Sequence, residues 1–366
     1  MPETFAFADD LGPEKLIEIT DPRVGLRAVL VVDNTAAGPA IGGCRMAPDV
    51  TVAECFRLAR AMTLKNAMAG LPHGGGKSVI FADPKIAGAQ KEALMRAFAR
   101  AIAEVTSYIV GPDMGTDETA MAWVRDEIGR SAGLPKELGG IPLDEIGATA
   151  WGLLAAARAA EEVAGIELDG ARVAVQGYGA VGRWAARFLS EAGVVVTAVS
   201  DSRGTAFADD GLDLAALDAA KADGRGVAEA EGVRSDDREA VVYADCDILI
   251  PAARPDVIRA DNVDRVRARM VLEGANIPST PEAEAALHDR GVIVVPDFVA
   301  NAGGVICAAV EHRHGTQREA MDVIEDTVHR NTAEALERAK RDGSLPRDAA
   351  RAIAEERVRR AMSFRR

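Results

Sequence analysis

A short apolar run that ends in closely spaced glycines is the feature that most restricts how this chain can fold. Residues 172–176 read RVAVQ and lead directly into GYGAVG at residues 177–182, and a helical pattern follows over residues 183–192. A second apolar run ends at Asp201, 24 residues after Gly177. The GxGxxG spacing alone is a weak signal. Placed between a strand and a helix, with an acidic residue at this distance, it predicts a βαβ unit that binds a dinucleotide.

Each position of the glycine run has an expected role in holding that ligand. Gly177 makes the tight turn, Gly179 lets the pyrophosphate approach the backbone, and Gly182 lets the helix pack closely on the strand. Ala180 and Val181 lie between these glycines, just before the expected helix, and are expected to contact the cofactor with them.

The end of the second strand bears on the choice between NAD and NADP. The carboxylate of Asp201 would accept hydrogen bonds from the adenosine ribose and disfavour a 2′-phosphate. Arg203, two residues later, would instead attract that phosphate. We therefore expect NAD as the cofactor, with NADP left open.

Strand and helix patterns alternate along most of the chain. Before the glycine run, a strand is expected at residues 27–33 and an amphipathic helix at residues 91–105. A glycine- and proline-bearing stretch at residues 133–142 marks a boundary, and a long helix over residues 147–164 follows it. The later part contains further expected strands and one polar surface excursion: strands at residues 194–200, 247–250, 270–272 and 292–295, and the excursion at residues 223–239.

These patterns predict an α/β protein with two domains. Helices that separate successive strands imply a parallel sheet with right-handed crossovers, which is the doubly wound, Rossmann-type arrangement. We expect an N-terminal α/β domain over residues 1–142, the Rossmann-type domain over residues 143–330, and C-terminal helices over residues 331–366 that pack back onto the N-terminal domain.

Composition excludes several classes of function. The 366 residues carry a formal net charge of −14, which argues against nucleic acid or an anionic membrane as the main partner. The four cysteines are scattered, which fits a reducing cytoplasm, and the five histidines offer no metal-binding spacing, so no metal site is expected. No window has the length and hydropathy of a signal core or a membrane span.

Two lysines, Lys65 and Lys77, lie in apolar stretches of sequence where a charged side chain is unusual. Lys65 follows Leu58 and Met62 at helical spacing, on a helix predicted to begin at Thr51, so it projects from the apolar face of that helix. Lys77 ends the run GGGK before another apolar stretch. Lysine is rarely buried without a partner, so two lysines in one sheltered place predict an anion site beside a reactive amine.

Two simpler interpretations compete with that one. Lys65 would snorkel if its methylenes were buried and its ammonium reached water. The run before Lys77 would be a phosphate loop only if a glycine stood five residues before Gly76, but Leu71 occupies that position and Gly70 lies one residue too early. The spacing therefore excludes a nucleoside-triphosphatase loop.

Several motifs, in this order along the chain, resemble the glutamate/leucine/phenylalanine/valine dehydrogenase superfamily. The resemblance covers residues 38–311, and its most specific segments are GPAIGGCRM at residues 38–46, MTLKN at 62–66, GGGK at 74–77, GPD at 111–113 and PDFVANAGGV at 296–305. It implies that the N-terminal domain binds an amino acid, that the second domain binds a nicotinamide cofactor, and that the chemistry takes place in a cleft between them.

The resemblance also implies roles for individual residues. Lys65 matches the lysine that holds the substrate α-carboxylate, Lys77 matches the general acid/base, and Asp113 matches the aspartate that moves a proton at the substrate nitrogen. Further positions implied to lie near the substrate are Gly42 and Gly43, and those implied near the cofactor are Thr149, Ala252 and Asn276. A helix-internal position for Thr149 and a capping role for Asn276 are the structural alternatives.

The implied reaction explains why these residue types are present. A hydride leaves the substrate α-carbon for the nicotinamide, water adds to the resulting imine, and ammonia departs to leave a 2-oxo acid. Each later step needs a group that exchanges protons near neutral pH. Burial and the nearby charge of Lys65 would both favour the neutral amine of Lys77, and Asp113 would oppose them.

The nature of the substrate side chain is less clear from the sequence. The nucleotide-binding half is most similar to glutamate-specific relatives, yet Ile41 and Ala308 stand where those relatives have the lysine and serine that hold the distal carboxylate. A buried carboxylate would be unpaired there at a cost of several kcal/mol. We expect an apolar pocket and an apolar L-amino acid, leucine or valine ahead of phenylalanine, with the pocket lined by Ile41, Met62, Gly111, Val305 and Ala308.

Two alternatives remain beside the apolar amino acid dehydrogenase. One is a glutamate dehydrogenase with an unrecognised counter-charge, and the other is a non-catalytic nucleotide-sensing protein on the same fold. The expected partners are the amino acid, its 2-oxo acid and ammonia, and relatives assemble as homo-oligomers through the N-terminal domain.

Overall fold

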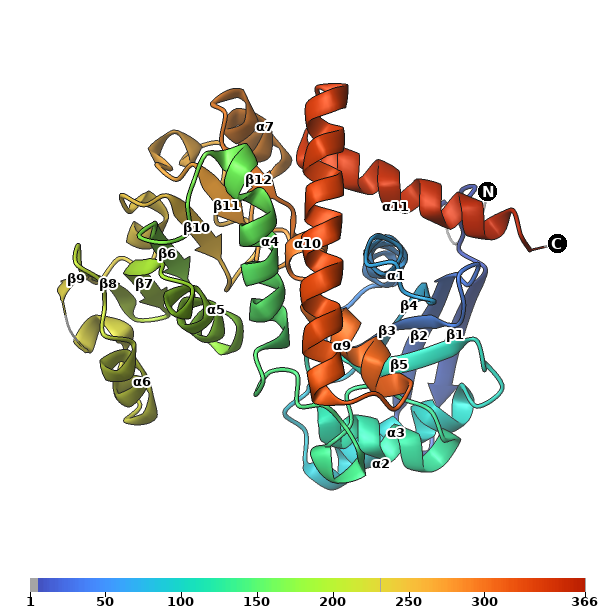
Figure 1. Cartoon of the computed structure of the whole chain (residues 1–366). Helices are drawn as coiled ribbons and strands as arrows, with labels where there is room; N and C mark the ends of the chain where they lie inside the picture. The colour runs from blue at the N-terminus through green and yellow to red at the C-terminus, as the bar shows by residue number, and fades with distance from the viewer. Residues whose placement is uncertain (1–5, 231, 366) are drawn as a thin grey trace. The chain divides into compact units, whose positions relative to one another are not determined.

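Each half of the chain builds its own sheet. The structure, a computed structural model, describes residues 6–230 and 232–365. The chain divides into two units, the first made of Met1–Pro142, Val305–Ala320 and Arg351–Arg366, and the second of Leu143–Gly304 and Met321–Ala350. Both units are α/β, which confirms the predicted fold class (Figure 1).

The first unit contains a mixed sheet of five strands among the described residues. In chain order these are β1 (Lys15–Asp21), β2 (Leu26–Asn34), β3 (Ala40–Ala47), β4 (Gly74–Phe81) and β5 (Tyr108–Pro112). They lie in the order β1-β2-β4-β3-β5. The β1, β2 and β4 strands pair antiparallel, whereas β3 is parallel to both β4 and β5. The carboxyl ends of β3, β4 and β5 therefore meet at one edge of the sheet.

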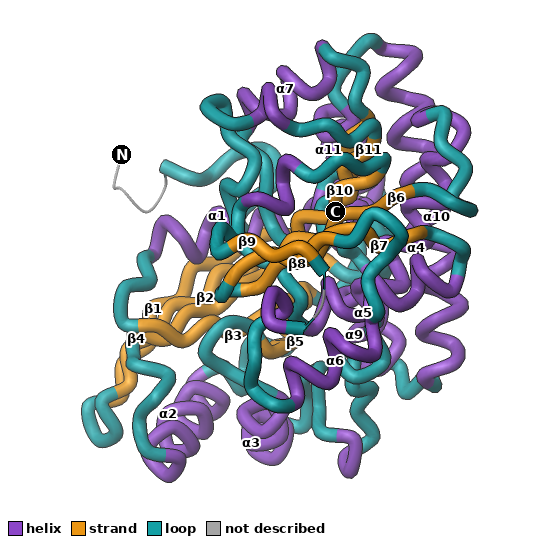
Figure 2. Tube along the Cα trace, turned by 90° about the vertical axis from the view of Figure 1, so that its left-hand side faces the viewer, coloured by secondary structure: helices purple, strands orange, loops and turns teal. Residues whose placement is uncertain are grey.

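Helices cover both faces of this sheet. The α1 helix (Val52–Met68) lies on one face, and α2 (Gly88–Ala101) and α3 (Glu118–Ile128) lie on the other (Figure 2). Alternate residues of β2 pack on the two sides, Val29 and Val31 with α1 and Leu30 with α2. The α2 helix ends earlier than the sequence pattern predicts, because turns at the C-terminal end lead the chain into β5.

The buried face of α1 differs from the predicted one. Leu58, Met62 and Lys65 are only half-buried, and the fully buried positions include Ala59 and Thr63. The reason is the glycine run of β4: a Cβ atom placed on Gly75 would lie 2.4 Å from the Thr63 hydroxyl oxygen. The helix lies so close to the strand that only small or hydrogen-bonding side chains fit between them. Leu58, Met62 and Lys65 therefore lie on the flank of the helix, beside its buried face.

The second unit contains a seven-stranded sheet within the described ranges. Its strands are β6 (Arg172–Gln176), β7 (Val195–Asp201), β8 (Gly204–Phe207), β9 (Val233–Ser235), β10 (Ile248–Pro251), β11 (Met270–Leu272) and β12 (Ile293–Val295). The order is β12-β11-β10-β6-β7-β8-β9, parallel from β12 to β7. The antiparallel strands β8 and β9 were not predicted, and β9 lies within the segment expected to be only a surface excursion.

Helices and short 3-10 turns complete the second unit. The helices are α4 (Ala148–Ala164), α5 (Ala180–Glu191), α6 (Leu214–Ala222), α7 (Pro281–Asp289) and α8 (Asp297–Ala300). The 3-10 turns of the two units are η2 (Lys136–Leu138), η3 (Val227–Glu229), η4 (Ala240–Tyr243) and η5 (Val263–Arg265). In the part of the chain that the structure describes, no helix is both long and apolar enough to cross a membrane.

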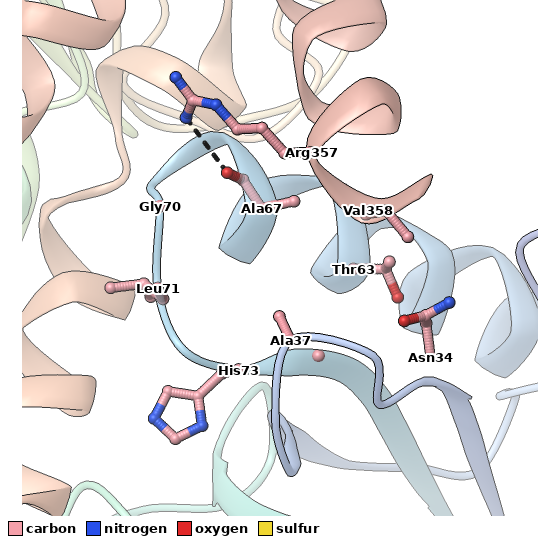
Figure 3. A pocket seen from close by; sticks show the side chains of 10 residues that line it. Asn34, Ala37, Thr63, Ala67, Gly70, Leu71, His73, Arg357 and Val358 are labelled. Atoms are coloured by element: carbon pink, nitrogen blue, oxygen red, sulfur yellow. Dashed lines mark hydrogen bonds between the residues drawn. The ribbon is translucent and has the colours of Figure 1, made fainter. Parts of the chain in front are cut away.

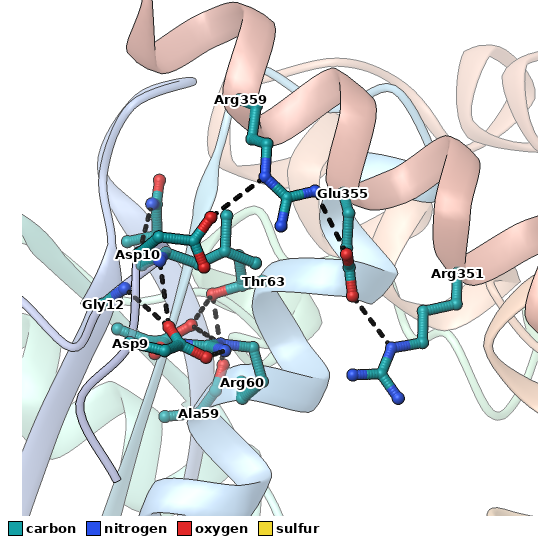
Figure 4. A network of polar contacts seen from close by, with 12 residues as sticks. Asp9, Asp10, Gly12, Ala59, Arg60, Thr63, Arg351, Glu355 and Arg359 are labelled. Atoms are coloured by element: carbon teal, nitrogen blue, oxygen red, sulfur yellow. Dashed lines mark hydrogen bonds and ion pairs between the residues drawn. The ribbon is translucent and has the colours of Figure 1, made fainter.

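Three helices end the chain: α9 (Gly303–His312), α10 (Gln317–Asp342) and α11 (Pro346–Met362). Within the first unit, the last part of α11 lies against the end of α1, where Arg357 donates hydrogen bonds to the carbonyls of Ala67 and Met68 (Figure 3). Arg359 pairs with Asp10 on the same side (Figure 4). A cavity of about 180 Å³ remains between these segments.

Candidate active site

Lys77, in the middle of β4, meets Asp113 at the carboxyl end of β5. Lys77 projects from β4, Asp113 directly follows β5, and the Lys77 Nζ lies 2.5 Å from Asp113 Oδ2. The Lys77 side chain is 7% exposed and that of Asp113 is 22% exposed. The two motifs that contain these residues are far apart in sequence, and the sheet brings their charged groups into direct contact.

A second cation shares the same carboxylate. Arg45 of β3 donates from Nε to Asp113 Oδ2 at 3.1 Å and from Nη1 to Glu54 at 2.5 Å. Burial would raise the pKa of Asp113, but the charge and hydrogen bond of Lys77, together with Arg45, outweigh burial and lower that pKa. Asp113 is therefore ionised at neutral pH and holds Lys77 in place.

Gly43 makes room for the ion pair. A Cβ atom placed on Gly43 would lie 2.7 Å from Asp113 Cβ and 3.1 Å from Lys77 Nζ. A Cβ atom on Gly42 would lie 1.8 Å from the Gly76 carbonyl oxygen. The buried Tyr108 hydroxyl donates to the Gly42 carbonyl at 2.9 Å, which fixes this part of β3. Glycine is required at both positions because backbone and charged groups approach them closely.

Lys65 and Met62 lie on the flank of α1. Met62 Cγ lies 3.4 Å from the position of a Cβ atom on Gly42, so this flank adjoins the glycines of β3. Asn66, the next residue after Lys65, donates from Nδ2 to the carbonyls of Gly74 at 2.7 Å and Ile41 at 3.3 Å. These bonds anchor the helix turn that carries Lys65 to both β3 and β4.

The predicted apolar pocket residues are partly assembled. Ile41 of β3 packs with Ile109 of β5 and Ala132, and Ala308 of α9 lies against them. Gly111 has room beside it, since a Cβ atom there would meet only the Ala132 carbonyl oxygen, at 3.8 Å. Val305 lies on α9 one turn before Ala308 and is half-buried.

Glu311 holds α9 to the segment that follows α3. Its buried carboxylate accepts backbone N–H groups from Gly133 at 2.8 Å, Leu134 at 3.1 Å and Ile141 at 2.9 Å. Three donors from one loop fix the C-terminal turn of α9. Because Ala308 lies one turn earlier, Glu311 also sets the position of Ala308.

The glycine turn of the second unit has the shape that a dinucleotide needs. Gly177 has φ 94° and a Cβ atom on it would lie 2.5 Å from the Ala253 Cβ, whereas a Cβ atom on Gly182 would lie 1.9 Å from the Gly177 carbonyl oxygen. Both glycines are required by the protein itself. A Cβ atom on Gly179 would meet nothing within 4 Å, so this backbone is open to a ligand at the start of α5, where Ala180 and Val181 lie.

A cavity of about 280 Å³ adjoins this turn and reaches Asp201. The Asp201 carboxylate is already engaged: it pairs with Lys221 at 2.8 Å and accepts the N–H groups of Arg203 and Val227. Its side chain is 6% exposed. Asp201 therefore holds the β7–β8 turn and the η3 turn together at the side of this cavity. Arg238 and Arg254 also line the cavity.

Three other predicted cofactor positions lie at loop or helix ends of the second unit. Ala252 follows β10, and its N–H donates to the Gln176 carbonyl at 2.8 Å. Asn276 lies in the loop after β11 and is exposed, and its Oδ1 accepts from Asn301 at 3.1 Å. The capping alternative for Asn276 is wrong, because Thr280 caps α7. Thr149 lies in the first turn of α4.

Sequence reasoning missed Arg45 and Glu54 as neighbours of the reactive pair. Arg45 belongs to the same motif as Gly42 and Gly43, which was the available signal. Glu54 lies in the first turn of α1, where its N–H donates to Thr51 Oγ1 at 3.0 Å while its carboxylate accepts from Arg45. Among the described residues, no group of three or more His, Cys, Asp or Glu side chains is arranged to hold a metal.

Comparison with known proteins identifies the family. Residues 139–366 match the family described as Glutamate/Leucine/Phenylalanine/Valine dehydrogenase, and residues 13–130 match its dimerisation domain. The chain is 40% identical over 360 residues to an NADP(+)-dependent glutamate dehydrogenase of Pyrobaculum calidifontis, covering 92% of this chain and 85% of the relative. It is 42% identical over 296 residues to a glutamate dehydrogenase of Thermotoga maritima, covering 77% and 71%.

Solved structures give the same family. A hetero-hexameric glutamate dehydrogenase from Thermus thermophilus, in a leucine-bound form, aligns with a TM-score of 0.86 and 33% identity over 100% of this chain and 92% of its own. An L-tryptophan dehydrogenase from Nostoc punctiforme aligns with a TM-score of 0.77 and 26% identity over 96% and 98%. This chain belongs to the glutamate/leucine/phenylalanine/valine dehydrogenase superfamily and is an NAD(P)-dependent amino acid dehydrogenase.

Proposed function

We propose that the chain catalyses the reversible oxidative deamination of L-glutamate to 2-oxoglutarate and ammonia. The observation that carries this proposal is the identity of 38–42% to relatives that are named glutamate dehydrogenases. The expectation of leucine or valine has no support among those names. The first unit binds the amino acid, the second binds the nicotinamide cofactor, and the chain assembles with itself as an oligomer.

The first unit supplies the proton chemistry of this reaction. A bound nicotinamide would accept the hydride from the substrate α-carbon. Lys65 binds the α-carboxylate, Lys77 takes a proton from the attacking water and later returns one, and Asp113 exchanges a proton with the departing nitrogen. The 2.5 Å contact between Lys77 and Asp113 supports this division of roles, since it gives the two groups a direct path for a proton.

NADP is the proposed cofactor. Two of the relatives are named as NADP-dependent or NADP-specific. Asp201 is held by Lys221 and two backbone N–H groups, so the carboxylate that would repel a 2′-phosphate is largely neutralised. Arg238 and Arg254 line the same cavity and carry the charge that such a phosphate attracts.

The distal carboxylate of glutamate needs donors that Ile41 and Ala308 do not provide. His312 lies one turn after Ala308 on α9, and its ring centroid lies 5.9 Å from that of His73. His73 Nδ1 contacts the Pro39 carbonyl oxygen, two residues before Ile41. This pair of imidazoles, just beyond the apolar pocket residues, would supply hydrogen-bond donors to the distal carboxylate.

An apolar amino acid is the second candidate. The cluster of Ile41, Ile109, Ala132 and Ala308 favours it, because burial of an aliphatic side chain there gains about 25 cal/mol per Å². A charged side chain would be desolvated on the same surface.

A substrate panel tests the proposal. We expect the purified protein to reduce NADP faster than NAD and to use L-glutamate in preference to L-leucine, L-valine and L-phenylalanine. The Ile41→Lys variant should raise kcat/KM for glutamate further, because it adds a cation beside the distal carboxylate. Turnover on leucine or valine alone in the parent protein, with glutamate use appearing only in Ile41→Lys, would replace glutamate by the apolar candidate.

A further inference from the structure

One arginine in the second unit holds three buried carboxylates from three different elements. Arg347, in the first turn of α11, donates from Nη2 to Glu273 at 2.6 Å, from Nε to Glu284 at 2.7 Å and from Nη1 to Asp297 at 2.8 Å. The three acidic side chains are 0%, 5% and 10% exposed, respectively. Three buried acids around one base is a costly arrangement, and stability of the fold alone gives no reason for it.

The network ties two points of one loop, its start and its middle, to the same guanidinium. Glu273 directly follows β11 and precedes residues 274–279. Asp297 accepts the Ile277 N–H at 2.9 Å through its Oδ2, and its own N–H donates to Glu273 Oε2 at 3.0 Å. Arg347 therefore fixes the start of the loop through Glu273 and its middle through Asp297.

The backbone of this loop is strained where the network holds it. Ile277 has φ 50°, an unfavourable conformation for a β-branched residue, and its side chain is 57% exposed. Its carbonyl accepts the N–H of Asp256 at 3.0 Å, and Asp256 itself has φ 52°. Strain of this kind persists only where the surroundings enforce it, and it gathers at ligand sites.

Asn276 lies between the two fixed points. It is exposed, and the hydrogen bond from Asn301 to its Oδ1 fixes the orientation of its amide. The loop follows β11 at the carboxyl ends of the parallel strands, and the residues around Ala252 follow the neighbouring β10. In open parallel sheets, ligands bind at these strand ends.

We propose that Arg347 and Glu273 are positioning residues that hold residues 274–279 so that Asn276 contacts the cofactor. This inference rests on the proposed role of the second unit as the cofactor-binding unit. Neither side chain touches the cofactor itself. They act through the backbone at Ile277 and through the start of the loop.

The charge of the network also makes it sensitive to pH. Burial raises the pKa of Glu273 to about 8, the charge of Arg347 opposes this rise, and Glu284 and Asp297 add to it. Glu273 Oε1 lies beside the Ser279 hydroxyl without a well-aligned hydrogen bond. As the pH rises through this raised pKa, Glu273 loses its proton, a third negative charge appears around one guanidinium and the hold on the loop loosens.

Cofactor affinity as a function of pH tests the inference. The dissociation constant of NADPH would be measured by fluorescence between pH 6 and about 9.5 for the parent protein and for Glu273→Gln, which mimics the protonated carboxyl. We expect the parent's constant to rise as the pH rises through the raised pKa of Glu273, and the constant of the variant to stay at its neutral value. Arg347→Lys, which keeps the charge but loses the fork, should weaken NADPH binding roughly tenfold at neutral pH.

Arg351→Lys is the matched control, because Arg351 lies one turn later on α11 and pairs with Glu355 at the surface. If Arg347→Lys does not fold, as judged by circular dichroism, the pH profile of Glu273→Gln still decides. Identical profiles for the parent and Glu273→Gln would overturn the inference and leave the proposed function standing. Failure of the parent to bind NADPH or NADH at any pH would overturn both.

Discussion

The reactive pair depends on how charge is shared around Asp113. Its Oδ2 receives both Lys77 Nζ and Arg45 Nε, while Glu54 takes the other end of Arg45. Two acids therefore face two bases, and the amine of Lys77 stays fixed at a site that is almost closed to water. In this arrangement each of the four charged groups has a partner of opposite sign.

At the residue scale, the space at Gly43 should be essential. The Gly43→Ala substitution places a methyl group 2.7 Å from Asp113 Cβ, so the two charged side chains must separate. We expect kcat to fall at least about 100-fold, as for other small displacements of catalytic groups, with cofactor binding retained. Gly88→Ala is the control, since a Cβ atom there meets nothing within 4 Å. Equal activity of both variants would show that the pair tolerates displacement.

The Asp113 carboxylate should also stabilise the fold in a pH-dependent way. Its pKa is lowered from the ordinary value of 3.8, so its contribution is present above that value and is lost as the pH falls through the folded-state pKa. Asp113→Asn should lower the free energy of unfolding by about 3 kcal/mol at neutral pH, because Lys77 loses its partner. Urea denaturation of this variant and of the exposed control Asp49→Asn would measure it. A difference that persists unchanged into strong acid would contradict the assignment.

At the element scale, α9 depends on one carboxylate for its position. Glu311→Ala leaves three backbone N–H groups of the 133–141 segment without their acceptor. We expect a loss of about 3 kcal/mol in the free energy of unfolding and a higher KM for the amino acid, with KM for the cofactor unchanged. Glu319→Ala, which removes a partly exposed partner of Arg313, should change neither quantity. If only the free energy of unfolding changed and KM for the amino acid did not, the position of α9 would have no effect on substrate binding.

The sequence predicted the elements whose pattern is local. The strands of the second unit are short apolar runs, and β6, the glycine turn and α5 form one continuous signal. Strands β8 and β9 were missed because both are short, and β9 is also the edge strand and lies in polar sequence. The buried face of α1 was wrong because the backbone of Gly75, in a distant strand, decides which side chains fit.

The same limit applies to the sites. Lys77 and Asp113 were expected together through family resemblance, and Arg45 was overlooked within the same motif. The Arg347 network joins positions from 273 to 347 that share no spacing or pattern. Such contacts depend on the tertiary fold, so only a structure can reveal them.

At the scale of the whole molecule, each unit has its own core and its own candidate site. The first carries the charged pair and the apolar pocket residues, and the second carries the glycine turn and the Arg347 network. Variants in the first unit should therefore mainly change the kinetic parameters for the substrate, and variants in the second unit mainly those for the cofactor. The central claim is that Lys77 transfers protons during amino acid oxidation, a reaction that needs both the substrate site of the first unit and the cofactor site of the second.

The most direct test of that claim compares the parent protein with Lys77→Ala in two assays. The first measures reduction of the nicotinamide by absorbance with L-glutamate present, and the second measures NADPH binding by fluorescence. We predict that Lys77→Ala binds NADPH like the parent and loses nearly all turnover, at least about 1,000-fold, while the exposed Lys85→Ala keeps both. Near-normal turnover of Lys77→Ala would contradict the account and remove Lys77 from the chemistry.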